Sequence, residues 1–370
     1  MSLVYWLKPM GCYGHCVTLN RMEVYYHAMD MTNPGQTRQQ INIAAVTRKP
    51  DSASYQQRVL GYLPILKEMG IHVTPITLPK GYIRQYHLLS QLKQYDAVWW
   101  HRHLITFPHL GRLRKMAKAL VFDFDDPVFY SSKNSGCNSQ SRQYRFTKLL
   151  KQCDATLPAS RYLQALADPF CDRSKLMPMA IDLPMNVNPK RQETDTIELL
   201  WLGSSSTQIY LERIRPVMEI LSQKHPSIKL RLVAHNQMTF GNLPVDFRSW
   251  SESEQDRALR ECHIGLCPMP DTRWTRGKSP FKVIQYMAHG MPWVGDGVGE
   301  NVTSAGDPKV SQTGLCATST EQWLDAILAL ASDPQRRTTM GHAGIEYVKK
   351  HHDRQQLAKD LAEFWHQLVK

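Results

Sequence analysis

Short apolar runs alternate with amphipathic stretches along most of the chain, a rhythm typical of a parallel sheet covered by helices. The β-branched run at 41–46 predicts a buried strand. The helical pattern over 55–69, closed by Gly70, predicts the helix that follows it. The strands expected in this half are INIAAV (41–46), IHVTPI (71–76), DAVWW (96–100), ALVFDFDD (119–126) and CDATLPAS (153–160). Ser160 is expected to cap the next helix.

The second half of the chain repeats this rhythm. The strands expected there are IELLWLG (197–203), IKLRLVA (228–234), DFRSW (246–250), HIGLCPM (263–269) and MPWVGD (291–296). The expected helices are 206–225, 254–262, 281–290, 320–333 and 354–369, with Gly290 ending the third. We therefore predict an α/β fold of two Rossmann-like domains that face each other across a cleft. Open α/β sheets bind ligands at the carboxyl ends of their strands, so we expect the site in that cleft.

A Pro- and Asn-rich segment, 182–195, has the composition of a linker. We expect an N-terminal domain at 41–185, a C-terminal domain at 196–352 and a final helix at 353–370. Residues 1–40 show little periodicity and contain five methionines, at positions 1, 10, 22, 29 and 31. We expect this segment to be a disordered extension or to precede the true translation start.

Positive charge is concentrated in the first half of the sequence. Residues 1–190 contain 24 Lys and Arg against 12 Asp and Glu, whereas residues 191–370 contain 21 of each kind. Such a surface favours an anionic partner, such as phospholipid headgroups, a phosphorylated substrate or nucleic acid. The densest cluster, GRLRKMAKAL (111–120), predicts an amphipathic helix with Leu113, Met116, Ala117 and Leu120 on its inner side. A solvated helix face is the plainer interpretation of this cluster.

The composition excludes several classes of protein. With 42% hydrophobic residues the chain is neither disordered nor collagen-like, and no run approaches the ~18–20 apolar residues of a transmembrane helix. The apolar run at 3–6 is too short for a signal-peptide core. The eight cysteines lack Cys-x-x-Cys and zinc-ribbon spacing, which favours a reducing compartment. We expect a cytoplasmic protein, or one held peripherally at the inner face of a membrane.

The segment RGKSPFKVIQYMAHGMPWVGDGVGEN (276–301) carries the clearest chemical signal. Its loop places Arg276 and Lys278 before a helix, where cations oppose the helix macrodipole and so point to a functional role. Cations, backbone N–H groups and the helix dipole together suit a bound phosphate. The GDGVGEN loop after the next strand can line the same cleft. We predict phosphate binding here; a helix with an ordinary basic loop is the alternative.

A second loop, WLGSSSTQ (201–208), lies where a nucleotide-binding sheet places its small-residue turn. The chain has neither G-x-G-x-x-G nor G-x-x-x-x-G-K-[ST]. The sequence therefore disfavours dinucleotide binding of the Rossmann type and P-loop NTPase chemistry.

Residues 41–370 resemble retaining glycosyltransferases of the GT-B fold, family four, which build polysaccharides and glycolipids from nucleotide sugars. The large motif at 276–301 is the specific part of the resemblance. The resemblance also rests on other segments, which occur in the expected order: SASYQQRVLGYLPILKEMGIHV (52–73), DAVWWHRHL (96–104), LVFDFDDPVF (120–129), CDATLPAS (153–160), LLWLGSSSTQIYLERIRPVM (199–218), IGLCPM (264–269) and the helix from Thr320. The resemblance implies a metal-independent transferase whose final helix packs back toward the N-terminal domain.

The resemblance also implies roles for individual residues. The residues placed around the donor diphosphate are Arg276, Lys278 and Lys282, of which Arg276 and Lys278 would neutralise the leaving group. The loop near the diphosphate and sugar would contain Gly203, Ser204 and Thr207. The residues that would hold the sugar or phosphate are Glu300, Asn301 and Val302. His101 falls where the family often keeps a catalytic histidine facing the sugar, with a packed or surface histidine as the alternative.

One departure from the family concerns Gln285. Members commonly carry two glutamates separated by seven residues across this helix, but here Gln285 takes the second position and the first is not recognisable. A neutral amide still hydrogen-bonds a ribose or sugar hydroxyl, but it cannot act as a carboxylate. The departure leaves open a changed donor or a non-catalytic relative.

The acidic run FDFDD (122–126) has the Asp-x-Asp form with which other glycosyltransferases hold Mn²⁺. Because it lies in the basic half, far from the phosphate loop, we expect no metal there and an acceptor-side role for Asp125 and Asp126. Arg58 is likewise expected to face the acceptor, with plain helix capping by Ser52 or Ser54 as the alternative interpretation of its segment.

The sequence thus predicts transfer of a sugar from a nucleotide diphosphate sugar to an acceptor hydroxyl, with no cofactor. The expected acceptor is a glycan or lipid-linked molecule, and the basic domain is expected to meet an anionic membrane. The alternatives are a non-catalytic scaffold subunit, a nucleotide-sugar epimerase on the same fold, and a basic nucleic-acid-binding protein. The last of these lacks a helix-turn-helix, RRM or zinc-finger signature.

Overall fold

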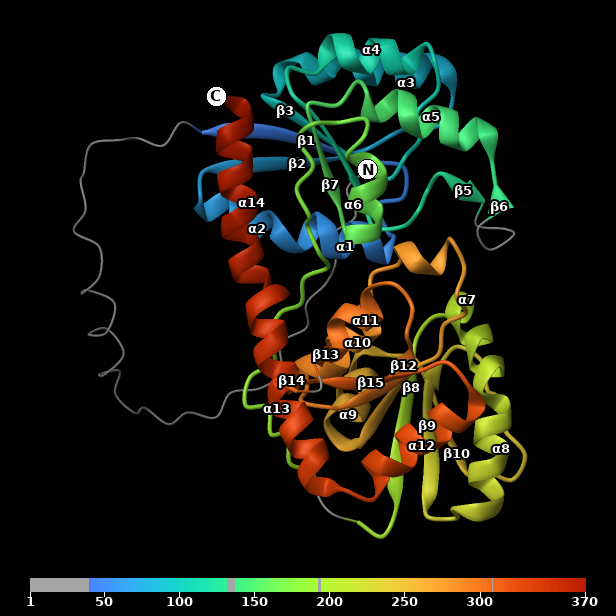
Figure 1. Cartoon of the computed structure of the whole chain (residues 1–370). Coiled ribbons are helices and arrows are strands. Elements are labelled where there is room, and N and C mark those ends of the chain that lie inside the picture. The colour runs from blue at the N-terminus through green and yellow to red at the C-terminus, as the bar shows by residue number, and fades with distance from the viewer. Residues whose placement is uncertain (1–39, 132–136, 192–193, 308) are drawn as a thin grey trace, which may run out of the picture. The chain divides into compact units, whose positions relative to one another are not determined.

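Two parallel sheets form the framework of the chain, one from each half of the sequence (Figure 1). The computed structural model describes residues 40–131, 137–191, 194–307 and 309–370. Except for Gln40, the extension predicted at 1–40 lies outside the described residues. The strand predicted to open the fold begins at Ile41, as expected.

The first sheet has the strand order β2-β1-β3-β4-β7, and all its pairings are parallel. Its strands are β1 (Ile41–Thr47), β2 (Ile71–Thr77), β3 (Ala97–His101), β4 (Leu120–Phe124) and β7 (Ala155–Pro158). The helices in this part are α1 (Ala53–Arg58), η1 (Leu60–Tyr62), α2 (Leu63–Glu68), α3 (Tyr82–Gln91), η2 (Leu92–Gln94), α4 (His109–Met116), α5 (Gln140–Leu150) and α6 (Arg161–Ala167). A two-stranded ribbon joins β5 (Tyr130–Ser131) to β6 (Cys137–Asn138).

The second sheet has the order β10-β9-β8-β11-β12-β15, also parallel throughout. Its strands are β8 (Ile197–Leu202), β9 (Ile228–Ala234), β10 (Val245–Ser249), β11 (Ile264–Cys267), β12 (Trp293–Asp296) and β15 (Gly314–Ala317). Its helices are α7 (Ser205–Gln208), η3 (Ile209–Ile214), α8 (Arg215–Lys224), α9 (Glu252–Glu261), η4 (Thr275–Gly277), α10 (Phe281–Ala288), α11 (Glu300–Ala305), α12 (Thr320–Ala331), α13 (Pro334–His351) and α14 (Arg354–Val369). β13 (Gly306–Asp307) pairs with β14 (Ser311–Gln312). The predicted α/β fold class is therefore confirmed.

Two predicted helices are divided in the structure. The helix expected at 55–69 consists of α1, η1 and α2, and the helix expected at 206–225 consists of α7, η3 and α8. In both cases the last piece carries a proline in its first turn, Pro64 in α2 and Pro216 in α8. Proline lacks a backbone N–H, so it fits the start of a helix and interrupts a longer one.

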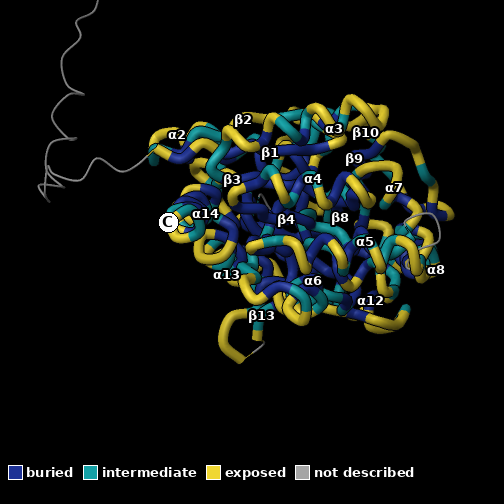
Figure 2. Tube along the Cα trace, turned by 90° about the horizontal axis from the view of Figure 1, so that it is seen from above, coloured by how far each residue is buried: buried dark blue, intermediate teal, exposed yellow. Residues whose placement is uncertain are grey.

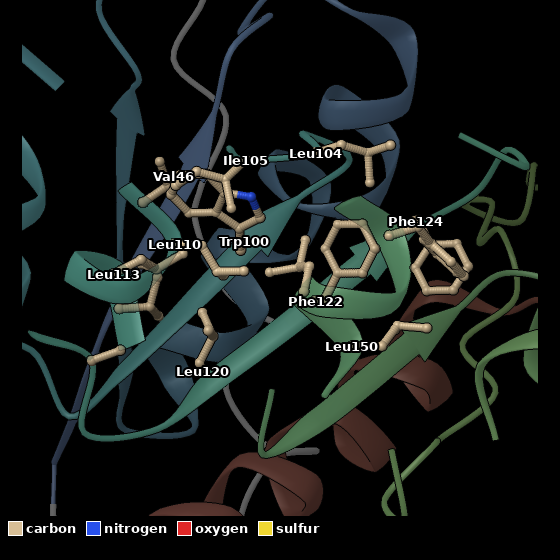
Figure 3. Packing of buried hydrophobic residues seen from close by; sticks show 14 of the residues in the cluster. Val46, Trp100, Leu104, Ile105, Leu110, Leu113, Leu120, Phe122, Phe124 and Leu150 are labelled. Atoms are coloured by element: carbon tan, nitrogen blue, oxygen red, sulfur yellow. The ribbon is translucent and has the colours of Figure 1, made fainter. Parts of the chain in front are cut away.

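The basic cluster at 111–120 forms a shorter helix than predicted. α4 ends at Met116, because Ala117 adopts an extended conformation and Leu120 begins β4. Leu113 still points inward, as expected, and packs with Leu110 and Trp100 in the core of the first sheet (Figure 3). The helix is thus amphipathic, but Leu120 belongs to the strand.

The central strands of each sheet are buried on both faces, which explains the apolar runs that predicted them. On one face of the first sheet, Phe122 and Phe124 stack with ring centroids 4.9 Å apart and pack beside α4 and α5 (Figure 3). On the other face, Trp99 contacts Trp365 of α14 with ring centroids 5.6 Å apart. The final helix therefore packs against the first sheet.

Exposed residues follow the outer helices. Figure 2 shows buried chain along β1 and β4 and exposed segments along α3 and around α2. Among the described residues, no helix combines the length and the apolar character needed to cross a bilayer. The six cysteines in the described part of the chain are all free thiols.

Candidate active site

A cavity of about 890 Å³ lies at the carboxyl ends of strands from both sheets. Leu202 ends β8 and Gly203 follows it, Cys267 ends β11, and Gln56 and Gln57 belong to α1, the helix after β1. Parallel strands of an α/β sheet end at one edge, where ligands bind. The cavity is therefore at the place that the sequence predicted for the site.

Seven of the predicted donor-site residues line this cavity. They come from three segments: the loop and short helix after β8, the η4–α10 segment, and α11. The seven residues are Gly203, Ser204, Thr207, Lys278, Lys282, Gln285 and Asn301. Segments separated by up to about a hundred residues in the sequence thus meet around one space.

Lys282 joins two of these segments. Its Nζ donates a hydrogen bond of 2.9 Å to Thr207 Oγ1 and lies 4.7 Å from the centroid of the Trp201 ring. Desolvation by the surrounding protein, together with the nearby Lys278 ammonium, lowers the pKa of Lys282 to about 8. An ammonium with a hydroxyl and an aromatic face as neighbours has spare capacity for an anion.

Gly203 permits this position of Lys282. A Cβ on Gly203 would lie 2.6 Å from Lys282 Cε and 2.9 Å from Nζ. The small-residue turn therefore needs glycine at this position because the Lys282 side chain comes so close to it. Any larger residue would displace the lysine.

Lys278 is the second cation of the cavity. Its Nζ lies 3.5 Å from Asp126 Oδ1 and 5.9 Å from the centroid of the Trp274 ring. Both members of the ion pair are only partly exposed, at 25% for Lys278 and 17% for Asp126. The predicted acceptor-side carboxylate and the predicted catalytic lysine are therefore neighbours.

The N-terminus of α10 opens onto the same space. Pro280 and Phe281, at the N-cap and first position of the helix, both line the cavity. The unpaired N–H groups and dipole of a helix N-terminus favour an anion. Asn301 contributes a polar group that is fully buried: its Nδ2 donates to the Asp296 carbonyl at 2.9 Å, while its Oδ1 has no partner.

Gln285 lies on the inner side of α10 and is 8% exposed. Its side chain belongs to the cavity lining, while its carbonyl accepts a hydrogen bond of 2.8 Å from His289 Nδ1 when that nitrogen is protonated. The residue that departs from the family pattern is therefore at the site, where an amide can meet a hydroxyl group.

Three predicted donor residues lie outside the cavity lining. Arg276 makes a bidentate ion pair with Asp271, with bonds of 2.6 and 2.8 Å, and Val302 is 56% exposed. Glu300 accepts hydrogen bonds from the backbone N–H and the guanidinium of Arg161, at 2.7 and 3.1 Å.

Arg276 and Glu300 share a neighbouring hollow of about 300 Å³. Gly299, with φ +56° and the Arg276 carbonyl 2.6 Å from its would-be Cβ, brings the two loops together.

His101 is packed rather than open to the cavity. It is 2% exposed, with Nε2 3.0 Å from Ser54 Oγ and Nδ1 3.4 Å from Thr47 Oγ1. Burial lowers the pKa of His101 to about 4, so the ring is neutral at physiological pH. The structure thus favours the packed interpretation of this histidine.

The prediction that Arg58 faces the acceptor is wrong. Arg58 is 1% exposed and binds Asp123, the Met177 carbonyl and the Leu157 carbonyl beneath the first sheet. Burial lowers the pKa of Arg58, but the Asp123 carboxylate outweighs it and holds that pKa above its usual value. The position on α1 places the side chain inward, and the N-cap of this helix is Ser52, which accepts from the Tyr55 N–H.

Asp125 and Asp126 both pair with Arg102, at 3.2 and 2.5 Å. Asp126 alone also reaches Lys278. Among the residues that the structure describes, no cluster of three or more His, Cys, Asp or Glu side chains is arranged to hold a metal ion.

The structure adds residues to the site that the sequence did not single out. His235 follows β9 and Trp250 follows β10, with ring centroids 6.3 Å apart, and both line the cavity. Arg354, at the start of α14, lines it too and bonds Gln57 Oε1 at 2.7 Å. Both residues could have been predicted from the sequence, because His235 directly follows a predicted strand, Trp250 ends another, and ligands bind at the carboxyl ends of strands.

Comparison with solved structures supports this architecture. Sucrose-phosphate synthase from Thermosynechococcus elongatus matches with a TM-score of 0.66 at 16% identity, over 89% of this chain and 99% of that one. HepE of Anabaena, solved in complex with UDP and glucose, matches with a TM-score of 0.65 at 14% identity, over 89% and 100%. The chain has the GT-B fold.

A third GT-B structure, the lipopolysaccharide outer core galactosyltransferase WaaB, matches with a TM-score of 0.63 at 10% identity, over 88% of this chain and 99% of that one. No family model matches the sequence, and no curated protein matches it. The similarity is therefore one of GT-B fold, and the function has to be argued from the site.

Proposed function

We propose that this GT-B chain is a glycosyltransferase that moves a sugar from a nucleotide diphosphate sugar to an acceptor hydroxyl. The observation that carries the proposal is the convergence of Lys278, Lys282 and the N-terminus of α10 on one cavity. Two cations and a helix dipole at one point suit a diphosphate. HepE, which has the same fold, was solved with UDP-glucose as well as with UDP.

In this proposal the two lysines act on the leaving group. As the bond between sugar and diphosphate breaks, negative charge grows on the diphosphate oxygens, and the ammonium groups of Lys278 and Lys282 neutralise it. Preorganised charge of this kind is usually the largest catalytic contribution. The lysines would do the work that a divalent metal does elsewhere, so we propose transfer without a metal.

The nucleoside would occupy the part of the cavity lined by His235 and Trp250. Trp250 is 43% exposed and offers an aromatic face to a base. Gln285, on the inner side of α10, would hydrogen-bond a hydroxyl of the ribose or the sugar.

The acceptor would enter from the side of the first sheet, where Asp126 lies beside Lys278. We propose retention of the anomeric configuration, with the leaving phosphate taking the acceptor proton on the same face of the sugar. The similarity to WaaB supports a role in polysaccharide, lipopolysaccharide or glycolipid synthesis, with a lipid-linked acceptor at a membrane.

The test is turnover of a panel of UDP-, GDP- and ADP-sugars, with release of nucleotide diphosphate measured with and without an acceptor mixture, and with EDTA or Mn²⁺. The proposal predicts release with one nucleotide and no loss in EDTA. Lys278→Ala should abolish release, whereas Lys224→Ala, at an exposed position of α8 outside the cavity lining, should not. Binding without any turnover would instead favour the non-catalytic interpretation that Gln285 leaves open.

A further inference from the structure

Four large apolar side chains are exposed on α3 and in the loop that precedes α4. Phe107 is 85% exposed, Ile83 70%, Tyr82 57% and Tyr86 40%. Together with the cations of α3 and α4, and with Lys80 just before α3, they form what we call the α3–α4 patch: Tyr82, Ile83, Tyr86 and Phe107, with Lys80, Arg84, Arg112 and Lys115. Tyr82 contacts His109, two residues after Phe107, so these exposed side chains come from neighbouring segments. Exposed apolar side chains on neighbouring segments commonly mark an interaction surface.

Contacts between the two helices hold the patch together. α3 and α4 lie side by side (Figure 1). The Tyr82 ring lies 4.3 Å from the His109 ring, and the Arg112 guanidinium lies 4.7 Å from the centroid of Tyr86. Arg112 also donates to Ser90 Oγ at 2.7 Å. These contacts orient the aromatic rings at the surface.

The outward position of these residues is not required by the core. Leu89 of α3 and Leu113 of α4 are fully buried in the core of the first sheet. Each helix therefore already packs through its inner side, and none of the patch residues lines the candidate active site. Tyr82, Ile83, Tyr86 and Phe107 lie outside the buried core cluster of the first sheet.

The charge around the patch is almost entirely positive. Between Lys80 and Lys118 the sequence contains eight Lys and Arg and one acidic residue, Asp96. Asp96 is bound by the Lys118 ammonium at 3.1 Å and by the Asn42 N–H at 2.9 Å. Within the described residues no ion pair joins a carboxylate to Lys80, Arg84, Arg112 or Lys115, so these cations are available to an external anion.

We propose that the α3–α4 patch docks the protein on an anionic lipid bilayer, with Ile83 and Phe107 entering the interface and Arg84 and Lys115 meeting headgroup phosphates. Tyrosine rings suit the headgroup level of a membrane, and each Lys or Arg near an anionic surface adds about 1 kcal/mol. A protein partner fits less well, because lysines such as Lys80 and Lys115 are depleted from protein interfaces. The inference deepens the proposed function, since it names the surface that would bring the enzyme to a lipid-linked acceptor.

The test is flotation of the full chain with vesicles of phosphatidylcholine alone and of equimolar phosphatidylcholine and phosphatidylglycerol, at low and high salt. The wild type binds the anionic vesicles and is released by salt. Arg84→Gln with Lys115→Gln lowers partitioning roughly 30-fold, as the loss of two cations predicts, and Ile83→Ser with Phe107→Ser lowers it at least about tenfold.

Two matched pairs serve as controls. Ile209→Ser with Val310→Ser removes apolar side chains that are 67% and 83% exposed elsewhere, and Lys224→Gln with Lys350→Gln removes two exposed cations from α8 and α13. Both pairs should bind as the wild type does. Equal losses in the controls, equal binding to both vesicles, or no binding at all would each overturn the proposal. The assay contains no donor, so its failure leaves the turnover result of the proposed function unaffected.

Discussion

The ammonium of Lys282 donates a hydrogen bond of 2.9 Å to the hydroxyl of Thr207, across 75 residues of sequence. The bond ties the short helix after β8 to the start of α10, and both elements were predicted to meet a diphosphate. With the Trp201 ring 4.7 Å away, the cation is held in place before any ligand arrives. A preorganised cation of this kind loses little entropy when it binds an anion.

Gly203→Ala tests whether the close approach to Lys282 matters. Its Cβ would lie 2.6 Å from Lys282 Cε and 3.1 Å from Trp201, so the lysine has to move. We expect nucleotide diphosphate affinity to fall about tenfold, the effect of weakening one charged hydrogen bond, measured by titration calorimetry. Gly111→Ala in α4, where a Cβ meets nothing within 4 Å, is the control and should leave affinity unchanged.

The lowered pKa of Lys282, about 8, predicts how binding depends on pH. Well below pH 8 the lysine is charged, so its own titration does not change the affinity for the diphosphate. Above pH 8 the ligand must also recruit a proton, so affinity falls by up to about tenfold per pH unit. In Lys282→Met this decline between pH 8 and 10 should disappear, and a wild type without any decline would contradict the assignment.

The same pKa gives a signed prediction for stability. Between pH 8 and the ordinary value of 10.5, the unfolded chain binds a proton at Lys282 that the folded, ligand-free chain has released. The contribution of Lys282 to the free energy of unfolding therefore increases with pH in that window. Chemical denaturation at several pH values gives the free energy of unfolding of the wild type and of Lys282→Met. The wild-type value should increase relative to the variant's as the pH rises from 8 to 10.5.

Asp126 competes with a ligand for Lys278, since its Oδ1 lies 3.5 Å from the lysine Nζ. Asp126→Asn should therefore raise nucleotide diphosphate affinity, roughly two- to fivefold for a partly exposed ion pair. Asp125→Asn is the matched control, because Asp125 pairs with Arg102 and makes no ion pair with Lys278. An equal gain in both variants would show that net charge, rather than the pair, is responsible.

Arg58→Met tests the structural assignment of a residue that the sequence had placed in the cleft. It leaves the buried Asp123 carboxylate without its partner, a change that costs about 3–5 kcal/mol of folding free energy. Denaturant unfolding followed by circular dichroism should show that loss. Nucleotide affinity of the folded variant should be unchanged, and a selective loss of binding without loss of stability would restore the cleft assignment.

The fold was predictable because strands buried on both faces of a parallel sheet are continuous apolar runs. Such runs can be recognised in the sequence without knowing which distant residues pack against them. The strands from Ile41, Ile71 and Ile197 begin where the pattern placed them. The loops after β8 and before α10 were also identifiable. The first is a turn of small residues, and the second places cations at a helix N-terminus, where they oppose the helix dipole.

The orientation of single polar side chains was not predictable. Arg58 and His101 lie on α1 and β3, but each side chain points into the interior of the first domain. Arg58 binds the buried Asp123 there, and His101 contacts the buried Ser54. Such partners are 65 and 47 residues away in sequence. Trp250 was missed for the opposite reason: a tryptophan at a strand end resembles core until the fold shows it exposed in a cavity.

The central claim is that Lys278 and Lys282 bind the diphosphate of a nucleotide sugar. The most direct measurement is titration calorimetry of UDP, GDP and ADP against the wild type, Lys278→Met, Lys282→Met and the surface control Lys224→Met, all in EDTA. The account predicts binding of one nucleotide, weakened roughly 10- to 100-fold in each cavity variant, as expected for a charged hydrogen bond, and unchanged in the control. Binding that survives both substitutions, or no binding of any nucleotide by the wild type, would contradict it.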